Sequence, residues 1–381
     1  MDSETLRIQQ KRQHLEELAR WRRQKYREPE LRRLFLEVTS QCNERCLHCG
    51  SSCTGAATEP VATDILVGIL ADVKKRLGIE RTQLCITGGE PLLRRDFFDL
   101  MAAANVLGYR WGMTTNGTLI TPSVAQRLAA CGMRTVSVSV DGLPDTHDSF
   151  RQRTGSYDEA ITGTRNLADQ GFEHVQITTV VHAWNINQLD VLFERFVEEP
   201  IDSWRLTTIE PMGRALDHPE LMLAPDDYRR LFSFIRAKRA DGWPVRYGCC
   251  HYLGLDLERE VRDAYFICSA GIYTASIMAN GDIGTCLDIE RNPLTIQGNV
   301  LHDDFVDVWR ERFGFFRREL AELAESEKPG AHDESSEFTA PGASGNRCAS
   351  CSDREFCAGG SWHSFDFAAN RQRVCLKGVV F

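Results

Sequence analysis

The sequence lacks the features that would place the protein in a membrane or outside the cell. It has no run of about 18 apolar residues, the length that a transmembrane helix needs. Its first residues, Met1–Thr5, are polar and do not form the apolar segment of a secretory signal peptide. We therefore expect a cytoplasmic protein with no membrane partner.

The chain also lacks the basic excess that nucleic-acid binding requires. Its formal net charge is −9, no helix-turn-helix pattern is present, and phosphate contacts need basic surface. We expect no nucleic-acid partner. Residues 1–33 are an exception, with ten Lys and Arg against six Asp and Glu. They are expected to form a basic helix that packs on the barrel described below, or alternatively an arm that docks an acidic peptide.

Disulfide bonds are not expected, although the chain has 14 cysteines. Disulfide-based scaffolds are usually short and secreted, whereas this chain has 381 residues and no export signal. Metal binding or redox chemistry explains the thiols better. The length is sufficient for one large core or two moderate ones.

The distribution of apolar residues predicts an α/β fold. Six apolar segments with the character of strands alternate with amphipathic segments that predict helices, and this alternation is typical of a parallel sheet. The strands are expected near residues 34–39, 83–87, 110–115, 135–140, 175–181 and 203–210, and the helices near residues 61–77, 94–107, 121–131, 156–171 and 186–198. Six units do not close a barrel of eight strands, so we expect an open, partial (β/α)6 barrel.

The pattern changes after Asp217, where we place a domain boundary. A helix is expected near residues 225–240, and Gly281-Asp282 is expected to form a hairpin turn. Residues 322–346 are rich in Glu, Gly, Pro and Ser, which predicts an acidic linker. The predicted domains are an N-terminal helix (1–33), the partial barrel (34–217) and a cysteine-rich C-terminal domain (218–381).

Three cysteines, Cys42, Cys46 and Cys49, follow the first predicted strand with the spacing C-x3-C-x2-C. A cubane iron–sulfur cluster takes four ligands, so three thiolates leave one iron open to another molecule. A closed zinc site is the alternative. Structural zinc sites use pairs of C-x2-C or paired histidines, and only His48 lies nearby. The spacing therefore favours a cluster, placed after a strand where barrel enzymes carry active sites.

Polar motifs also follow the next predicted strands. Gly88-Gly89-Glu90 ends the second strand; adjacent glycines allow a ligand to approach the backbone, and a carboxylate can pair with an ammonium group. Asn116 follows the third strand, and Ser139 and Asp141 lie at the end of the fourth. Such groups can bind a ribose or a carboxylate, although Asp-Gly is also a common turn pair.

The cysteine spacing and the Gly-Gly-Glu motif together resemble the radical S-adenosylmethionine (radical SAM) superfamily. The resemblance implies a 4Fe–4S cluster whose open iron binds SAM, with Gly88, Gly89 and Glu90 holding the SAM amino group. It also implies that reductive cleavage of SAM gives a 5′-deoxyadenosyl radical, which abstracts a hydrogen atom from substrate. It places Ser139 and Asp141 near the ribose and methionine of SAM.

Arg151 lies in a segment, residues 150–157, that resembles peptide-modifying members of the superfamily. We expect it to bind a carboxylate of the cofactor or substrate, or else to be an exposed loop arginine. Asn116 completes the set of predicted SAM-binding residues.

The C-terminal cysteines resemble the SPASM extension, which occurs on peptide- and protein-modifying radical SAM enzymes and holds up to two auxiliary 4Fe–4S clusters. The resemblance implies that one cluster is held by Cys348, Cys351, Cys357 and Cys375. It implies that Cys268 and Cys286 hold another.

The second of these clusters departs from the family pattern. Ser361 stands where the family usually has a cysteine, four residues after Cys357. Candidates for the missing ligands are Cys249, Cys250 and His363, because imidazole can replace thiolate on iron. The alternatives are an open iron, no cluster at this site, and a His363 that is only hydrogen-bonded. Cys53 is not expected to be a ligand.

The function implied is that of a radical SAM oxidoreductase that matures a ribosomally synthesised and modified peptide (RiPP). It would install a cross-link or another oxidative modification, with Asp288 and Glu290 as candidate bases. The expected partners are a precursor peptide and an electron donor such as flavodoxin or ferredoxin. Because 33 residues are too few for a fused leader-binding domain, we expect either a separate leader-binding protein or direct docking of the peptide. Alternatives are a sulfatase-type maturase of a protein residue, a tetrapyrrole or small-molecule enzyme, and a non-catalytic iron–sulfur regulator.

Overall fold

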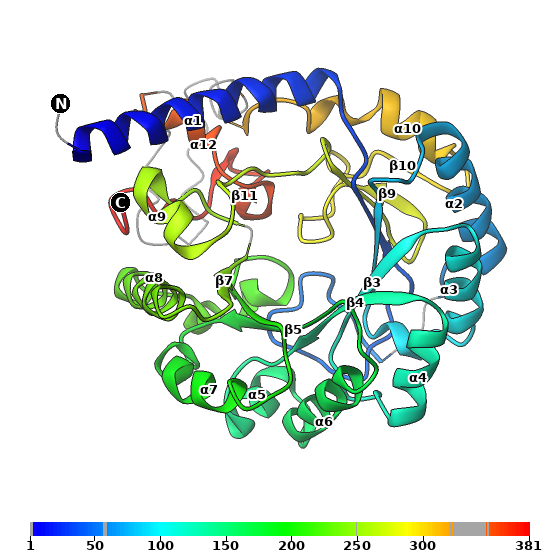
Figure 1. Cartoon of the computed structure of the whole chain (residues 1–381). Coiled ribbons are helices and arrows are strands. Elements are labelled where there is room, and N and C mark those ends of the chain that lie inside the picture. Colours follow the sequence, from blue (N-terminus) through cyan, green and yellow to red (C-terminus); the bar gives the residue numbers. More distant parts are fainter. Residues whose placement is uncertain (1–2, 56–58, 249, 321, 323–347, 349) are drawn as a thin grey trace.

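The computed structural model describes residues 3–55, 59–248, 250–320, 322, 348 and 350–381 (Figure 1). The predicted acidic linker 322–346 lies outside these residues, apart from residue 322. Among the described residues, no helix is both long and apolar enough to cross a membrane.

The six predicted strands form a parallel sheet in chain order, which confirms the predicted fold class. They are β1 (Arg33–Glu37), β2 (Gln83–Thr87), β3 (Arg110–Thr115), β4 (Met133–Ser139), β5 (His174–Val181) and β6 (Ser203–Thr208). In Figure 1 the strands curve round the centre of the molecule, with helices outside them.

Further strands extend this sheet at both edges. β7 (Val245–Tyr247) pairs with β6, and β8 (Thr274–Ile277) pairs with β1, both in parallel. β9 (Asp282–Gly284) and β10 (Gly298–Asn299) continue the edge beyond β8 in antiparallel. All four come from the region predicted as the C-terminal domain, so the sheet contains strands from both sides of the boundary predicted at residue 217. The boundary there stays a prediction.

Helices cover the outer face of the sheet. α2 (Thr63–Leu77), α3 (Phe97–Val106), α4 (Pro122–Ala130), α6 (Ser156–Ala168), α7 (Leu189–Phe196) and α8 (Pro225–Ala240) each overlap a predicted helix. The short α5 (Pro144–Arg151) was not predicted. Its sequence, PDTHDSFR, has a single apolar side chain after the proline, so it carries no apolar periodicity to detect.

Side chains alternate between the two faces of the strands, and the two faces differ in chemistry. The outward side chains are apolar and buried against the helices: Leu34, Leu36, Leu84, Ile86, Trp111, Met113, Val136, Val138, Val175, Ile177 and Leu206. The inward side chains are mostly small and polar. Register places Thr114 beside Ser137 and Ser139 beside Thr178 on this inner face. We call the surface that carries these inward side chains the inner face; its members include Cys85, Thr114, Ser137, Ser139, Gln176 and Thr178.

The C-terminal region has short elements. β8 and β9 form the predicted hairpin, and the loop is Met278–Gly281, with Gly281 at a φ of 90° that favours glycine. The remaining elements are α9 (Gly254–Val261), α10 (Phe305–Glu311), α12 (Arg354–Cys357), β11 (Phe365–Asp366) and β12 (Arg371–Gln372). Short 3-10 turns are η1 (Pro91–Leu93), η2 (Ile186–Gln188), η3 (Gly213–Asp217), η4 (Pro219–Leu221), η5 (Phe313–Phe315) and η6 (Trp362–Ser364).

The N-terminal basic segment forms the helix α1 (Ser3–Arg27), which lies across the top of the view in Figure 1. The predicted packing partner was wrong. α1 packs on α9 and α12 of the C-terminal region, where Leu15 is buried with Tyr252, Phe266 and Phe356. The apolar stripe predicted the helix, but not which distant segment would cover the stripe.

Candidate functional site

The loop that carries Cys42, Cys46 and Cys49 follows β1 at the carboxyl edge of the parallel sheet. Arg214 closes this loop. Its guanidinium donates to the carbonyl oxygens of Cys46 at 2.8 Å and Cys53 at 2.7 Å, and its backbone N–H donates to the carbonyl oxygen of Cys49 at 3.2 Å. The three predicted ligands therefore lie on one restrained turn.

The thiols of this turn differ in acidity. Burial raises the pKa of Cys42 to about 11 and the pKa of Cys46 well above its ordinary value. A hydrogen bond from the Cys53 thiol lowers the pKa of Cys49 to about 6. Metal ligation requires thiolates and releases protons, so Cys42 and Cys46 lose a proton on binding, whereas the hydrogen bond from Cys53 favours the thiolate of Cys49.

The two glycines of the Gly-Gly-Glu motif pack against the cysteine loop. A Cβ atom at Gly88 would lie 2.6 Å from the carbonyl oxygen of Thr39, and one at Gly89 would lie 2.1 Å from that of Gln41. The Glu90 N–H donates to the Gln41 carbonyl oxygen at 2.8 Å. The two glycines let two loops of the chain meet and so fix Glu90 beside the cysteines. Their contact with SAM stays a prediction.

Glu90 is fully buried, and its carboxylate is held by the end of β3. It accepts from the Thr115 hydroxyl at 2.9 and 3.0 Å and from the Asn116 N–H at 2.9 Å. Burial raises the pKa of Glu90 to about 7. Asn116 also donates from its side chain to Asn43 of the cysteine loop at 2.7 Å. Two predicted SAM-binding residues are thus bonded to each other next to the predicted cluster ligands.

Arg151 binds two carboxylates, both from this chain. Its guanidinium donates to Asp141 at 2.7 and 2.9 Å and to Glu44, within the cysteine loop, at 2.7 Å. The expectation of an exposed loop arginine is wrong, because Arg151 ends α5 and is buried.

Asp141 is fully enclosed. Its second oxygen accepts from the Val180 N–H at 2.7 Å. Burial acts to raise the pKa of Asp141, but the Arg151 charge, the two neighbouring histidines His48 and His147, and the Val180 N–H together outweigh it and lower the pKa to about 2. This geometry favours a structural role for Asp141, and its contact with SAM stays a prediction. Ser139 differs, since it is half-buried on the inner face beside Thr178.

Sequence reasoning missed an aromatic stack beneath the cysteine loop. The His48 ring stacks on Phe150 at 4.5 Å between centroids, and Phe150 stacks on His182 at 3.9 Å. Burial lowers the pKa of both histidines to about 4, so both rings are neutral at pH 7. No signal in the sequence links these residues, which come from three separate segments.

The four last predicted ligands come together in the structure. The Cys351 N–H donates to the Cys348 carbonyl oxygen at 3.2 Å, and the Arg354 N–H, at the start of α12, donates to the Cys351 carbonyl oxygen at 3.1 Å. Burial raises the pKa of Cys357 at the end of α12, and the charges of Cys375, Cys348 and Cys351 raise it further. The Lys377 ammonium donates to the Cys351 sulfur at 3.4 Å.

Cys268 and Cys286 also lie near one another, since both pack against the apolar cluster that contains Trp362 and Phe365. Cys249 lies outside the described residues. Of the candidate bases, Asp288 is exposed and has an oxygen 3.8 Å from the Cys286 sulfur, whereas Glu290 is paired with Arg373 at 3.0 Å.

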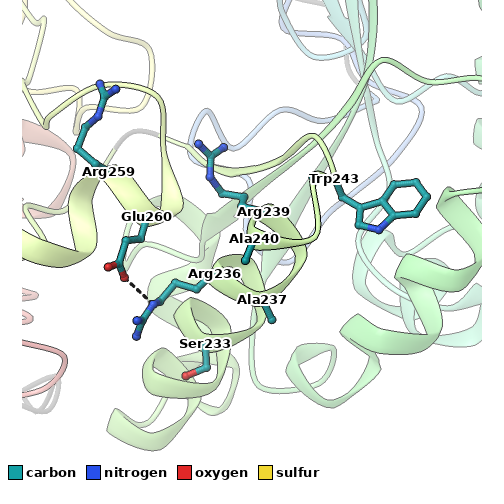
Figure 2. Close-up of a pocket in the computed structure, with 9 residues that line it drawn as sticks. Ser233, Arg236, Ala237, Arg239, Ala240, Trp243, Arg259 and Glu260 are labelled. Atoms are coloured by element: carbon teal, nitrogen blue, oxygen red, sulfur yellow. Dashed lines mark ion pairs between the residues drawn. The ribbon is translucent and has the colours of Figure 1, made fainter.

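A surface pocket between α8 and α9 is separate from these groups. Figure 2 shows its arginines and Trp243, with Arg236 paired to Glu260 at 2.6 Å. Among the described residues, none of those predicted for SAM or metal binding lines it.

The comparisons with known proteins agree with this arrangement. The model of the radical SAM superfamily matches residues 36–196, which contain the cysteine loop, the Gly-Gly-Glu motif and Arg151. The mycofactocin maturase MftC of Mycolicibacterium smegmatis is 30% identical over 332 residues, covering 86% of this chain and 77% of that protein. The chain belongs to the radical SAM superfamily. It is therefore an enzyme whose cofactors are SAM and a 4Fe–4S cluster.

Two further proteins are similar to this chain in sequence or in structure. The AdoMet-dependent heme synthase of Nitratidesulfovibrio vulgaris is 29% identical over 315 residues, covering 76% of this chain and 82% of that protein. The structure of Streptococcus suis SuiB bound to S-adenosylmethionine has a TM-score of 0.66 at 19% identity, covering 91% of this chain and 77% of that one. SuiB thus shows the shared fold.

The donor set of the cysteine loop fits the radical SAM cluster. Three thiols on one restrained turn could provide three ligands. The Glu44 N–H donates to the Cys42 sulfur at 3.4 Å, the Cys46 thiol donates to the Glu44 carboxylate at 3.6 Å, and the Cys49 N–H donates to the Cys46 carbonyl oxygen at 3.3 Å. Glu90 lies beside them. The assignment of Cys42, Cys46 and Cys49 as ligands stays a prediction.

Proposed function

We propose that this radical SAM enzyme is a maturase of a ribosomally synthesised precursor peptide. The observation that carries the proposal is the polar inner face of the partial barrel. An extended peptide has N–H and C=O groups that must find partners when they leave water. Hydroxyl and amide groups of Thr114, Ser137 and Gln176 line the inner face, where a peptide would meet them.

The relatives support the same substrate class. MftC is by name a maturase, and SuiB has been solved with its precursor peptide SuiA. The inner face is also held in shape by its own bonds, since the Ser137 and Thr178 hydroxyls lie 2.6 Å apart and Gln176 donates to Ser137 at 3.1 Å. A wall that is already bonded loses little entropy when a peptide binds.

The chain's own residues would prepare the reaction. Cys42, Cys46 and Cys49 would hold the cluster, and Glu90 would accept hydrogen bonds from the SAM ammonium group. When bound, the cluster and SAM supply a 5′-deoxyadenosyl radical that abstracts hydrogen from the substrate. The buried Phe150 ring, stacked on the half-buried His48 ring, would limit the access of water at this end of the barrel.

We also propose that the C-terminal cysteines form a SPASM domain. Cys348, Cys351, Cys357 and Cys375 would hold an auxiliary cluster. Loss of a hydrogen atom leaves a substrate radical, so an oxidised product forms when one electron passes to that cluster and one proton passes to a base. Asp288 is exposed and suits the base better than Glu290, which Arg373 already binds.

The proposed reaction needs a source of electrons and a means of bringing the peptide to the enzyme. The SAM cluster must be reduced, which would be done by an electron donor such as flavodoxin or ferredoxin. A separate leader-binding protein would bring the precursor peptide.

A tetrapyrrole is the second candidate substrate, because the heme synthase relatives are nearly as similar as MftC. A tetrapyrrole is a flat, largely apolar ring with carboxylate side chains. Arg205, which register places on the inner face beside Thr178, suits those carboxylates. The hydroxyl-rich wall does not suit the ring.

An anaerobic turnover experiment tests the proposal. The reconstituted protein is reduced with dithionite and given SAM together with a candidate precursor peptide or with an iron coproporphyrin. We expect 5′-deoxyadenosine and a mass change in the peptide, both lost in Cys46→Ala. Conversion of the coproporphyrin with an unchanged peptide would overturn the peptide assignment.

A further inference from the structure

Position 361, where the family pattern has a cysteine, cannot provide a thiolate. Ser361 is buried, and its hydroxyl lies 3.1 Å from that of Ser364. Its carbonyl oxygen accepts from the Gln372 side chain at 2.9 Å. This serine is therefore bonded into its own turn. Any centre held by Cys268 and Cys286 must take another ligand.

His363, two residues further on, lies among thiols. It belongs to the turn η6 and is 6% exposed. Its Nδ1 atom is 3.8 Å from the sulfur of Cys250, which is also buried. Ligand atoms of His363, Cys286 and Asp288 all lie within 4.8 Å of one another. Three segments far apart in the sequence thus bring metal-binding groups to one place.

Cys268 belongs to the same place. Cys268 and Cys286 both pack against the apolar cluster that contains Trp362. The Cys268 sulfur also accepts hydrogen bonds from the backbone N–H groups of Trp362 and Ala270. Trp362 directly precedes His363, so Cys268 is bonded to the turn that presents the imidazole.

We propose that Cys250, Cys268, Cys286 and His363 hold a metal centre with three thiolate ligands and one imidazole ligand. His363 replaces the thiolate that Ser361 does not provide. This donor set suits an iron–sulfur cluster with one nitrogen ligand, and it also suits a single zinc ion. Asp288 is the exposed member of the group and is assigned to proton transfer, outside the ligand set.

The position of the centre gives it a use. Cys286 follows β9, and register places Gly284 at the end of β9 in one row with Ser276, Phe35 and Cys85, so the centre lies at the edge of the sheet whose inner face is the proposed peptide site. Imidazole ligation raises the reduction potential of an iron–sulfur cluster relative to thiolate ligation. An iron centre here would accept an electron more readily than an all-thiolate cluster. This role as an electron acceptor rests on the proposed function, whereas the metal site itself does not.

Pulsed electron paramagnetic resonance tests the ligand assignment without any turnover. The protein is produced with ¹⁵N-histidine in a Cys42/Cys46/Cys49→Ala background, reduced, and examined together with its iron, sulfide and zinc contents. We expect a ¹⁵N coupling in a cluster signal, lost in His363→Cys and kept in Asp288→Asn. If the centre is zinc, the iron signal has no nitrogen coupling, and zinc-edge absorption shows one nitrogen ligand that His363→Cys removes.

Misfolding is excluded by an internal control. Cys348, Cys351, Cys357 and Cys375 provide a separate, all-thiolate signal, which His363→Cys should leave unchanged. The proposal is overturned if wild-type protein shows neither a histidine nitrogen at iron nor bound zinc. It is also overturned if the nitrogen signal survives in His363→Cys. Neither result would bear on whether the substrate is a peptide, because the experiment contains no substrate.

Discussion

At the scale of single residues, Arg151 is the charge on which the cysteine loop depends. It joins Glu44 of that loop to Asp141, and all three side chains are buried. Arg151→Met would leave two buried carboxylates unpaired, so we expect the free energy of unfolding to fall by about 3–5 kcal/mol. Urea unfolding of the apoprotein measures this.

Arg153→Met is the matched control for that variant. Arg153 pairs with Glu159 at 2.8 Å, but the two side chains are 32% and 41% exposed. Such pairs contribute about 0–1 kcal/mol. Equal losses in the two variants would contradict the role given to Arg151.

Glu90 should make stability depend on pH. Burial raises the pKa of this carboxyl from 4.5 to about 7, so the folded state holds a proton that the unfolded state has lost. The stability of the folded state that comes from this proton is complete below pH 4.5 and disappears as the pH rises through about 7. Glu90→Gln keeps a neutral side chain at every pH.

The measurement is urea unfolding of both apoproteins at several pH values. We expect Glu90→Gln to gain stability relative to wild type as the pH rises from 4.5 to about 7. The gain should be on the order of 3 kcal/mol, from the size of the pKa shift. A difference that does not change with pH would show that Glu90 titrates normally.

At the scale of elements, the contact between the β2 end and the cysteine loop leaves no room for a side chain. Gly89→Ala would place a Cβ 2.1 Å from the backbone oxygen of Gln41, so one of the two loops must move. We expect a loss of about 1–3 kcal/mol in stability and poorer iron retention by the reconstituted protein. Thermal unfolding and iron analysis measure the two effects.

Gly68→Ala provides the opposite case. Gly68 lies inside α2, and a Cβ there meets no atom within 4 Å. Alanine in a helix is favoured over glycine by about 0.5–1 kcal/mol, so this variant should be more stable than wild type. If both alanine variants behaved alike, the packing explanation for Gly89 would fail.

The elements also show what can be predicted from the sequence. β1 to β6 were predictable because their apolar residues alternate with small polar ones and lie between amphipathic helices. α5 was not, because only Phe150 and the residues near it are buried and the helix has no periodic apolar stripe. The short β7 and β8 are defined by pairing to β6 and β1 rather than by their own composition.

At the scale of the whole molecule, the sequence predicts which residues carry chemistry better than it predicts their partners. The cysteine loop and Glu90 were predicted from motifs. The bond from Arg151 to Glu44 joins residues 107 positions apart, and the approach of His363 to Cys250 joins residues 113 apart. No local pattern encodes such contacts, because they depend on how distant segments close on one another.

The packing of α1 gives a prediction at this scale. Arg22, which is 3% exposed, donates to the carbonyl oxygens of Phe356 at 2.9 Å and Glu355 at 2.7 Å, so α1 holds α12, the helix that contains Cys357. Arg22→Met would leave those carbonyls without their donor. We expect faster loss of the proposed C-terminal cluster under a chelator, with the SAM cluster retained.

The two clusters can be followed separately. The decay of the C-terminal signal is recorded in the Cys42/Cys46/Cys49→Ala background, and the SAM cluster is followed through its change in spectrum on adding SAM. Arg20→Met is the control, because Arg20 lies on the same helix but is exposed. If α1 only shields a surface, both arginine variants will lose the cluster at the wild-type rate. If α1 holds α12 in place, only Arg22→Met will lose it faster, and the N-terminal helix then belongs functionally to the C-terminal metal site rather than to the barrel.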